Sequence, residues 1–210
     1  MTNSKIKPIF SPNEDYNKSS FLNWNTNPNN DIENILVLAH GFLASSIELI
    51  NISLINNNDK KADFLIFPIL TNANHGIELY LKALCWTLNK LTNSHNRIEG
   101  SHNIKQILDT IKSKILNLEG SEALKYFNNA TIDLHNYIDE LFKKIEATQK
   151  QDKMDFSRYP LDNKYSNHFY VKELGNIEID LENLLSRIQI IFDSLEDRAS
   201  YYFYHKLQGN

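Results

Sequence analysis

The stretch Phe64–Leu91, FLIFPILTNANHGIELYLKALCWTLNKL, decides the fold class of this chain. Its apolar residues recur every three or four positions, which is the spacing of one face of an amphipathic α-helix. Pro68 is expected to kink this helix, and Gly76 to let a neighbouring helix approach closely. The expected buried face consists of Phe64, Phe67, Leu70, Ala73, Ile77, Leu81, Leu84, Leu88 and Leu91.

The same periodicity predicts further helices on both sides of this stretch. A helix over residues 31–56 is expected to begin at Asp31 and to lie antiparallel to the first, because a short polar break joins them. Shorter helices are expected from Ser101 or His102 to Gly120 and over residues 121–148, and Asp180 is expected to cap a long last helix. Residues 168–179 alternate around Gly175-Asn176, which is typical of a hairpin turn. The predicted fold is an all-α bundle of five to six helices with a short β-hairpin before the last helix.

Composition supports one helical domain. The chain has 210 residues, of which 41% are hydrophobic, so it can build a sizeable core, and its 6 glycines and 5 prolines are few for a fold made of tight turns. The polar residues 1–30 are expected to form a poorly ordered N-terminal arm, and residues 31–210 the helical domain. The single cysteine, Cys85, excludes a disulfide within the chain and is typical of a reducing cytoplasm.

Charge and hydropathy limit which kinds of partner, membrane or nucleic acid, we expect this protein to bind. Polar residues such as His40, Glu48 and Lys82 interrupt the most apolar stretches, and no signal-like segment begins the chain, so we expect a soluble cytoplasmic protein that contacts no membrane. The net charge of −4 provides no general attraction for nucleic acid. An RNA-binding function would therefore need a local basic patch.

The seven histidines raise the question of a metal site. His75 with Glu78, and His135 with Asp139, are spaced so that each pair lies on one helical face. A second pair at matching depth is not evident for either, and histidines at helix ends and crossings commonly make ordinary hydrogen bonds. The sequence therefore predicts no metal and no cofactor.

Three segments, in order, carry a family resemblance: NANHGIELYLKAL (residues 72–84), GSHNIKQIL (residues 100–108) and FSRYP (residues 156–160). Together with the long closing helix, they resemble the HEPN family. There, a helix with a Glu-Leu-x-Leu-Lys-Ala-Leu run is followed by a His-x-Ile/Leu helix start, a loop with Arg-Tyr-Pro and a last long helix. The resemblance covers about residues 31–205.

The resemblance implies a metal-independent endoribonuclease of the toxin–antitoxin or phage-defence kind. Nucleolytic HEPN members carry an Arg followed after four to six residues by a His on the last helix, and Arg198 and His205 have that form with six residues between them. His205 would be the general base or acid for attack by a ribose 2′-hydroxyl, and Arg198 would stabilise the charge on phosphorus. On an α-helix, a separation of seven places both side chains on nearly one face.

The resemblance also implies where RNA would bind and how copies would pair. Arg158, Lys82, His75 and Glu78 are the candidate substrate-binding residues, and an active nuclease needs Arg158 or Lys82 close to the catalytic pair. Paired copies across a homodimer usually build the site. The aromatic run Tyr201–Tyr204 independently favours a dimer, because successive residues point around the whole helix and one core cannot bury them all.

Other interpretations remain open at this point. The chain can instead be a catalytically silent binding module that pairs with itself or with a partner protein encoded nearby, such as a nucleotidyltransferase-like effector. Arg198 would then extend its charged end to solvent or pair with Asp193 or Glu196. Arg158 can cap helix carbonyls rather than hold a phosphate, and Glu78 with Lys82 can be an ordinary solvated pair one helical turn apart.

Overall fold

The structure is a computed structural model that describes residues 7–94, 96, 101–146, 157–161, 164–168, 171 and 177–209. Within those residues the chain is an all-α bundle without strands, which confirms the predicted class. A 3-10 turn (Tyr16–Lys18) lies in the N-terminal arm. The helices are α1 (Asp31–Ile55), α2 (Ala62–Leu91), α3 (Ile104–Glu119), α4 (Ser121–Ala130), α5 (Ile132–Glu146) and α7 (Leu181–Ser200), and α7 continues into the π-helix η2 (Tyr201–Leu207).

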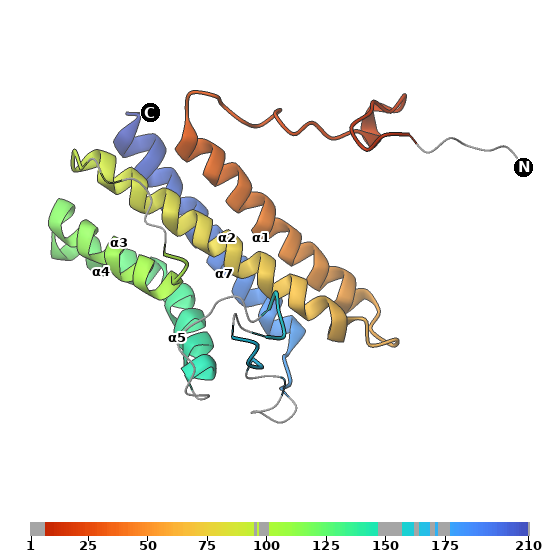
Figure 1. The fold of residues 1–210 in the computed structure, drawn as a ribbon. Helices are drawn as coiled ribbons and strands as arrows, with labels where there is room; N and C mark the ends of the chain where they lie inside the picture. The colour runs from red at the N-terminus through yellow and green to blue at the C-terminus, as the bar shows by residue number, and fades with distance from the viewer. Residues whose placement is uncertain are drawn as a thin grey trace, which may run out of the picture.

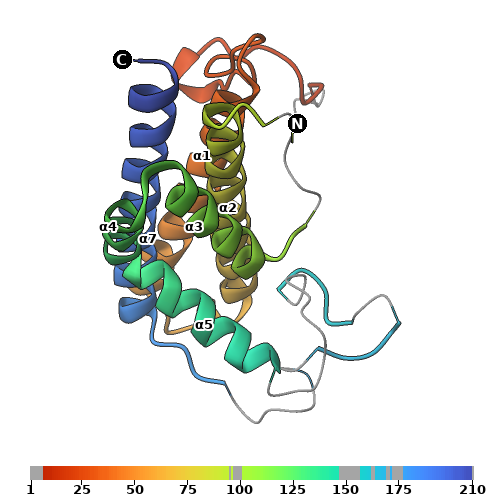
Figure 2. The ribbon, with the colours of Figure 1, turned by 90° about the vertical axis from the view of Figure 1, so that its left-hand side faces the viewer.

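Three long helices form the body of the bundle. α1 and α2 lie side by side along most of their length, and α7 packs against both (Figure 1). The other face of α2 is covered by α3, while α4 follows α3 and α5 turns back across the lower part of the bundle (Figure 2). The described part of the arm extends away from this body and meets it where Asn27 and Asn34 exchange hydrogen bonds of 2.7 and 2.8 Å.

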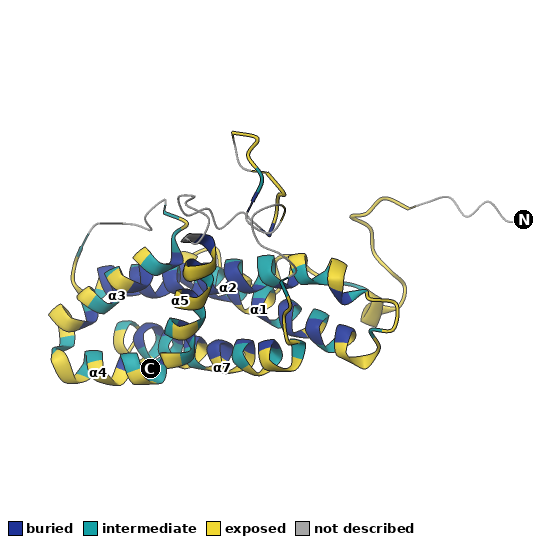
Figure 3. Cartoon of the chain, turned by 90° about the horizontal axis from the view of Figure 1, so that it is seen from below, coloured by how far each residue is buried: buried dark blue, intermediate teal, exposed yellow. Residues whose placement is uncertain are grey.

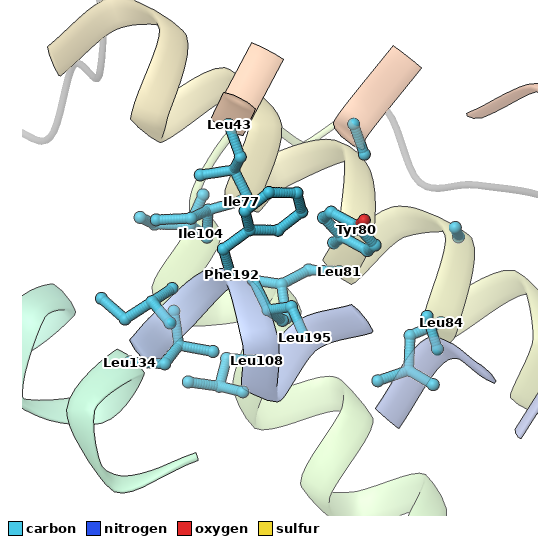
Figure 4. Close-up of a cluster of buried hydrophobic side chains, with 14 of the residues drawn as sticks. Leu43, Ile77, Tyr80, Leu81, Leu84, Ile104, Leu108, Leu134, Phe192 and Leu195 are labelled. Carbon is cyan, nitrogen blue, oxygen red and sulfur yellow. The ribbon is translucent and has the colours of Figure 1, made fainter. Parts of the chain in front are cut away.

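The core lies where α1, α2, α3 and α7 meet. Leu43, Ile77, Tyr80, Ile104 and Phe192 pack together there although they come from four helices (Figure 4). Buried residues lie along the inward faces of the helices and exposed residues along the outward faces (Figure 3), as the helical periodicity predicts. Because α2 is held between its neighbours, the position of each polar residue along α2 decides which neighbouring helix its side chain faces.

The helix ends follow local chemistry, with small shifts from the predicted positions. The side chain of Asn30, rather than that of Asp31, caps α1 by accepting a hydrogen bond from the backbone N–H of Glu33. Asn103 caps α3 by accepting from the backbone N–H of Gln106, so α3 begins two or three residues after the predicted start. Asp180 caps α7 through Glu182 and Asn183, as predicted. Gly120 ends α3 with a φ of 87°, which glycine adopts without strain.

The structure corrects one expectation about α2, and part of another expectation falls outside the described residues. The start of the predicted α2 face is wrong, because Phe64 and Phe67 are 76% and 37% exposed while Ile69 is fully buried, so the bundle core does not reach the first turns of α2 on the predicted face. The turn of the expected β-hairpin, Gly175-Asn176, lies outside the described residues, and a single antiparallel bridge, Leu161 with Asn167, is the only strand-like pairing in the described part.

One helix in the described residues, α1, is long and apolar enough to cross a membrane by length and composition alone. The core helix of a water-soluble bundle passes the same test. Here Ile32, Ala39, Leu43 and Ile50 of α1 are buried inside the bundle against its neighbours.

Gly76 provides the first testable prediction, because a Cβ added there would lie 2.7 Å from Leu43 Cγ and 3.0 Å from the Leu43 backbone nitrogen on α1. Replacing Gly76 by Ala should lower the free energy of unfolding by about 1–3 kcal/mol, since α1 and α2 must separate. Gly41, an exposed α1 residue with nothing within 4 Å of its added Cβ, is the matched control. Gly41→Ala should raise stability by about 0.5–1 kcal/mol. Urea denaturation measures both; a Gly76→Ala variant as stable as Gly41→Ala would contradict this packing.

Candidate functional site

Arg198 lies in the last turn of α7 between two aromatic rings. Its guanidinium carbon is 4.9 Å from the centroid of Tyr126 on α4 and 5.8 Å from that of Tyr201. Its Nε is buried and has no hydrogen-bond partner among the described residues. The rings restrict where the guanidinium can lie and attract its charge through their faces. Arg198 is therefore held in one orientation by stacking rather than by the expected pairing with Asp193 or Glu196.

His205 lies in the π-helix that continues α7. In a π-helix each backbone N–H bonds five residues back rather than four, so the chain turns less per residue than an α-helix. The expectation that Arg198 and His205 share a face assumed α-helical geometry. In the structure, Lys206 places its ammonium 5.4 Å from the centroid of the Tyr201 ring that Arg198 also flanks. His205, the residue before Lys206, is exposed.

Glu119, the last residue of α3, anchors the π-helix. Its Oε1 is 2.9 Å from Lys206 Nζ, and its Oε2 accepts a 2.8 Å hydrogen bond from the Tyr202 hydroxyl. Burial by itself would raise the pKa of Glu119, but Lys206 and Tyr202 stabilise the ionised form and bring the pKa below its ordinary value. The carboxylate therefore fixes the turn that carries His205.

This anchor gives a prediction for the pH dependence of stability. A carboxyl whose pKa is lowered in the folded state stabilises the fold above its unfolded pKa, and that contribution is lost as the pH falls through the folded pKa. Unfolding followed by circular dichroism should therefore show the wild type losing more stability than Glu119→Gln on acidification from neutral pH. Glu122→Gln, at an exposed position in the first turn of α4, is the control. Equal acid sensitivity of wild type and Glu119→Gln would contradict the assignment.

The core of this chain buries more of the aromatic run Tyr201–Tyr204 than the sequence predicts. Tyr202 and Phe203 are buried in the core, and Tyr201 and Tyr204 are half-buried against it. The expectation of leftover aromatic side chains that need a partner assumed regular α-helical directions, which the π-helix changes. The aromatic run therefore adds little to the case for a dimer.

The four candidate substrate-binding residues lie elsewhere, at the other end of α3. His75, Glu78 and Lys82 lie on one face of α2, together with Thr71 one turn earlier. Glu78 is almost completely buried, and its Oε1 lies 2.8 Å from Lys82 Nζ. The expectation of an ordinary solvated pair is therefore wrong, because the start of α3 covers this part of α2.

His102 completes this cluster from the start of α3. Its Nδ1 is 2.9 Å from the same Oε1 of Glu78, while its side chain is 74% exposed. With Nδ1 bound to the carboxylate, Nε2 is the ring nitrogen left to act on a ligand. A buried carboxylate that orients an accessible imidazole is an arrangement suited to acid–base chemistry or to anion binding.

The loop that carries Arg158 lies against the same face. Ser157, next to Arg158, accepts a 2.9 Å hydrogen bond from the Thr71 hydroxyl. His75 packs edge-on against Phe42 with its ring centroid 4.5 Å away, and its buried Nδ1 has no partner among the described residues. Burial lowers the pKa of His75, and the charges of Arg158 and Lys82 lower it further against the opposing effect of Glu78. His75 is therefore harder to protonate than an ordinary imidazole.

The two sets of candidate residues do not meet within one chain. Glu78 binds His102 just before α3 begins, whereas Lys206 and Tyr202 bind Glu119 where α3 ends. The 16 residues of α3 span about 24 Å at 1.5 Å per residue. The groove in which Arg158 or Lys82 would assist Arg198 and His205 is therefore absent from the described part of a single chain.

Some of these residues gave no usable signal in the sequence. His102 lies in a segment that carried the family resemblance, yet its contact with Glu78 depends on how α3 packs on α2. Tyr126, Glu119 and Lys206 join Arg198 only through tertiary packing, and no motif marks them. The π-helix that brings Lys206 into place has no simple residue pattern.

Comparison with known proteins identifies no relative: no family model, curated protein or solved structure matches this chain. Among the described residues, no group of three or more His, Cys, Asp or Glu side chains is arranged to hold a metal ion.

Proposed function

We propose that this chain is a HEPN-like, metal-independent endoribonuclease of the toxin or phage-defence kind that acts in the cytoplasm as a homodimer. One observation carries the proposal more than any other. Arg198 and Lys206 flank a single tyrosine ring, Tyr201, on the turn that exposes His205. An exposed imidazole and two cations on the same helical end would supply the acid–base group and the charge that cleavage of a phosphodiester needs.

The chemistry assigns one role to each group. His205 takes the proton of a ribose 2′-hydroxyl, whose oxygen attacks the adjacent phosphorus, and the bond from phosphorus to the 5′-oxygen breaks. Arg198 stabilises the additional negative charge on the phosphoryl oxygens. A second acid, such as His205 of the other copy in a dimer, protonates the departing 5′-oxygen. The products carry a 2′,3′-cyclic phosphate and a 5′-hydroxyl, and no metal takes part.

A local group of basic side chains would attract RNA although the net charge of the chain, −4, does not. Arg198, Lys206 and His205 lie within one helical end, and Glu119 offsets one of their charges while it holds Lys206 in place. A patch of this size retains RNA weakly and with strong dependence on salt. A dimer that pairs the last helices would double it.

A second candidate function, the catalytically silent binding module, is favoured by a different feature. Apolar side chains are exposed where α1 ends and α2 begins, and they include Ile52, Ile55, Phe64 and Phe67. An exposed apolar group of this kind is typical of a surface that meets another protein. The partner in this interpretation is a second copy or an effector such as a nucleotidyltransferase-like protein.

Incubation of the purified chain with RNA in the presence of a chelator tests the proposal. Cleavage into fragments with 2′,3′-cyclic phosphate ends supports the nuclease. RNA that stays intact both with chelator and with added divalent metal rejects it and favours the binding module.

A further inference from the structure

We propose that two copies of this chain exchange their N-terminal arms, so that an aromatic cluster on the arm of each copy packs on the apolar end of the α1–α2 hairpin of the other. This arm cluster consists of Tyr16, Phe21 and Trp24. The proposal concerns the arm and α1 rather than the turn that carries Arg198 and His205, so it stands or fails independently of RNA cleavage.

The arm cluster is a small folded unit outside the bundle. The ring centroid of Phe21 lies 5.6 Å from that of Tyr16 and 5.6 Å from that of Trp24, and Asp15 caps the 3-10 turn that begins at Tyr16. The described arm extends away from the helices (Figure 1), and none of its residues is buried. The three side chains are 61%, 47% and 68% exposed. Aromatic rings gathered at such exposure are typical of a surface that another protein covers.

The apolar surface that would receive the cluster lies where α1 ends and α2 begins. Ile52 and Ile55 in the last turn of α1 are 47% and 83% exposed, and Phe64 in the first turn of α2 is 76% exposed. Along α1 as a whole, only 28% of the most apolar stretch is buried inside the single chain. A helix that is apolar around most of its circumference needs a neighbour on its outer side as well.

The length of the arm decides which copy of this surface the cluster can reach. Asn27 is fixed to the first turn of α1 by its hydrogen bonds of 2.7 and 2.8 Å with Asn34. Trp24 lies three residues before Asn27, and three residues span at most about 11 Å. Ile52 lies five turns of α1 beyond Asn34, which is about 27 Å along the helix axis. The intact cluster can therefore meet this surface only on a second copy.

Two-fold symmetry lets both exchanges form in one dimer. When two α1 helices lie antiparallel, the start of each, which carries the arm, lies beside the end of the other, which carries the receiving surface. Leu38 is 54% exposed on nearly the same face as Ile52, about four turns earlier, so apolar contact continues between the two ends. Two clusters and the surfaces they cover remove on the order of 1,000 Å² from water, which is close to what a specific interface needs.

Analytical ultracentrifugation of the full chain over a micromolar concentration series tests the proposal. We expect a monomer–dimer equilibrium, and Phe21→Ala combined with Trp24→Ala should raise the dissociation constant at least about a hundredfold, because each dimer loses four rings. Ile132→Ala, which shortens an exposed apolar side chain at the start of α5, is the matched control and should associate as the wild type does. A wild type that stays monomeric, or an arm variant that associates like the wild type, overturns the proposal.

Mixing two variants separates exchange between copies from docking within one chain. Ile55→Asp combined with Phe64→Asp removes the receiving surface, changes only exposed side chains and should prevent association, like the arm variant. A mixture of both variants should form heterodimers, because the intact arm of one chain meets the intact surface of the other. A fluorescent label on one variant reports them, and circular dichroism checks that both are folded. A mixture that stays monomeric where the wild type is fully dimeric overturns the exchange.

The fluorescence of Trp24 gives a readout that needs no change in the arm. Trp24 and Trp86 are the two tryptophans of the chain, so Trp86→Phe leaves Trp24 as the single reporter. Its emission should move to shorter wavelength with increasing protein concentration, with the dissociation constant found by ultracentrifugation, because the ring leaves water. A shift on addition of phosphatidylcholine vesicles but not with protein concentration assigns the arm to a membrane, and short-wavelength emission from the monomer assigns it to its own chain; either result overturns the proposal.

Discussion

Replacing Arg198 by alanine should slow RNA cleavage by about 10²–10³-fold, because the charge that develops on the phosphoryl oxygens loses its fixed partner. Its guanidinium is held by the rings of Tyr126 and Tyr201, so little reorganisation is needed when charge appears. The rates are measured with a fluorescent RNA in chelator.

Two controls separate this role from stability. The stacking of Arg198 on two rings is worth about 1 kcal/mol, so melting of the Arg198→Ala variant should shift only slightly. Arg198→Lys keeps the charge but loses the planar fork of donors, and it should recover only part of the rate. An Arg198→Ala enzyme that cleaves as fast as the wild type would contradict the role, whatever its stability.

Replacing Glu78 by alanine should lower the free energy of unfolding by about 3 kcal/mol, because it leaves the ammonium of Lys82 without its partner in a nearly closed environment. The side chain of Lys82 is 13% exposed and that of Glu78 is 7% exposed, so solvent cannot replace the lost contact. The free energy is obtained from urea denaturation.

An exposed pair provides the comparison for Glu78. Lys112 and Asp109 on α3 are 3.2 Å apart, but the Asp109 side chain is 62% exposed. Lys112→Ala should change the stability by less than about 0.5 kcal/mol. A Glu78→Ala loss as small as that of Lys112→Ala would show that Glu78 is not a buried anchor.

The helices could be predicted because burial repeats with the helical period. Ile77, Leu81, Leu84 and Leu88 follow one another at three or four residues, and all are buried as expected. Phe64 fits the same pattern but is exposed, because periodicity does not report where the neighbouring helix ends. The ends at Asp180 and Gly120 were predictable for a local reason, since a cap or a positive φ depends on one residue.

The candidate sites were predictable only in part. The face shared by His75, Glu78 and Lys82 follows from helical spacing, but the burial of Glu78 and its contact with His102 depend on the packing of α3. The relation of Arg198 to His205 was predicted with α-helical geometry, and the π-helix replaced it with one in which Lys206 lies against Tyr201. Glu119 binds this turn although it lies 83 positions before Tyr202 in the chain, and no local sequence pattern indicates that contact.

The role of His205 in RNA cleavage is tested by comparing the wild type with His205→Ala, both purified in the same way and assayed in chelator. We expect the wild type to form fragments with 2′,3′-cyclic phosphate ends and His205→Ala to lose at least about 10²-fold in rate with unchanged folding, because an exposed imidazole contributes little to packing. Cleavage by His205→Ala at the wild-type rate would contradict it.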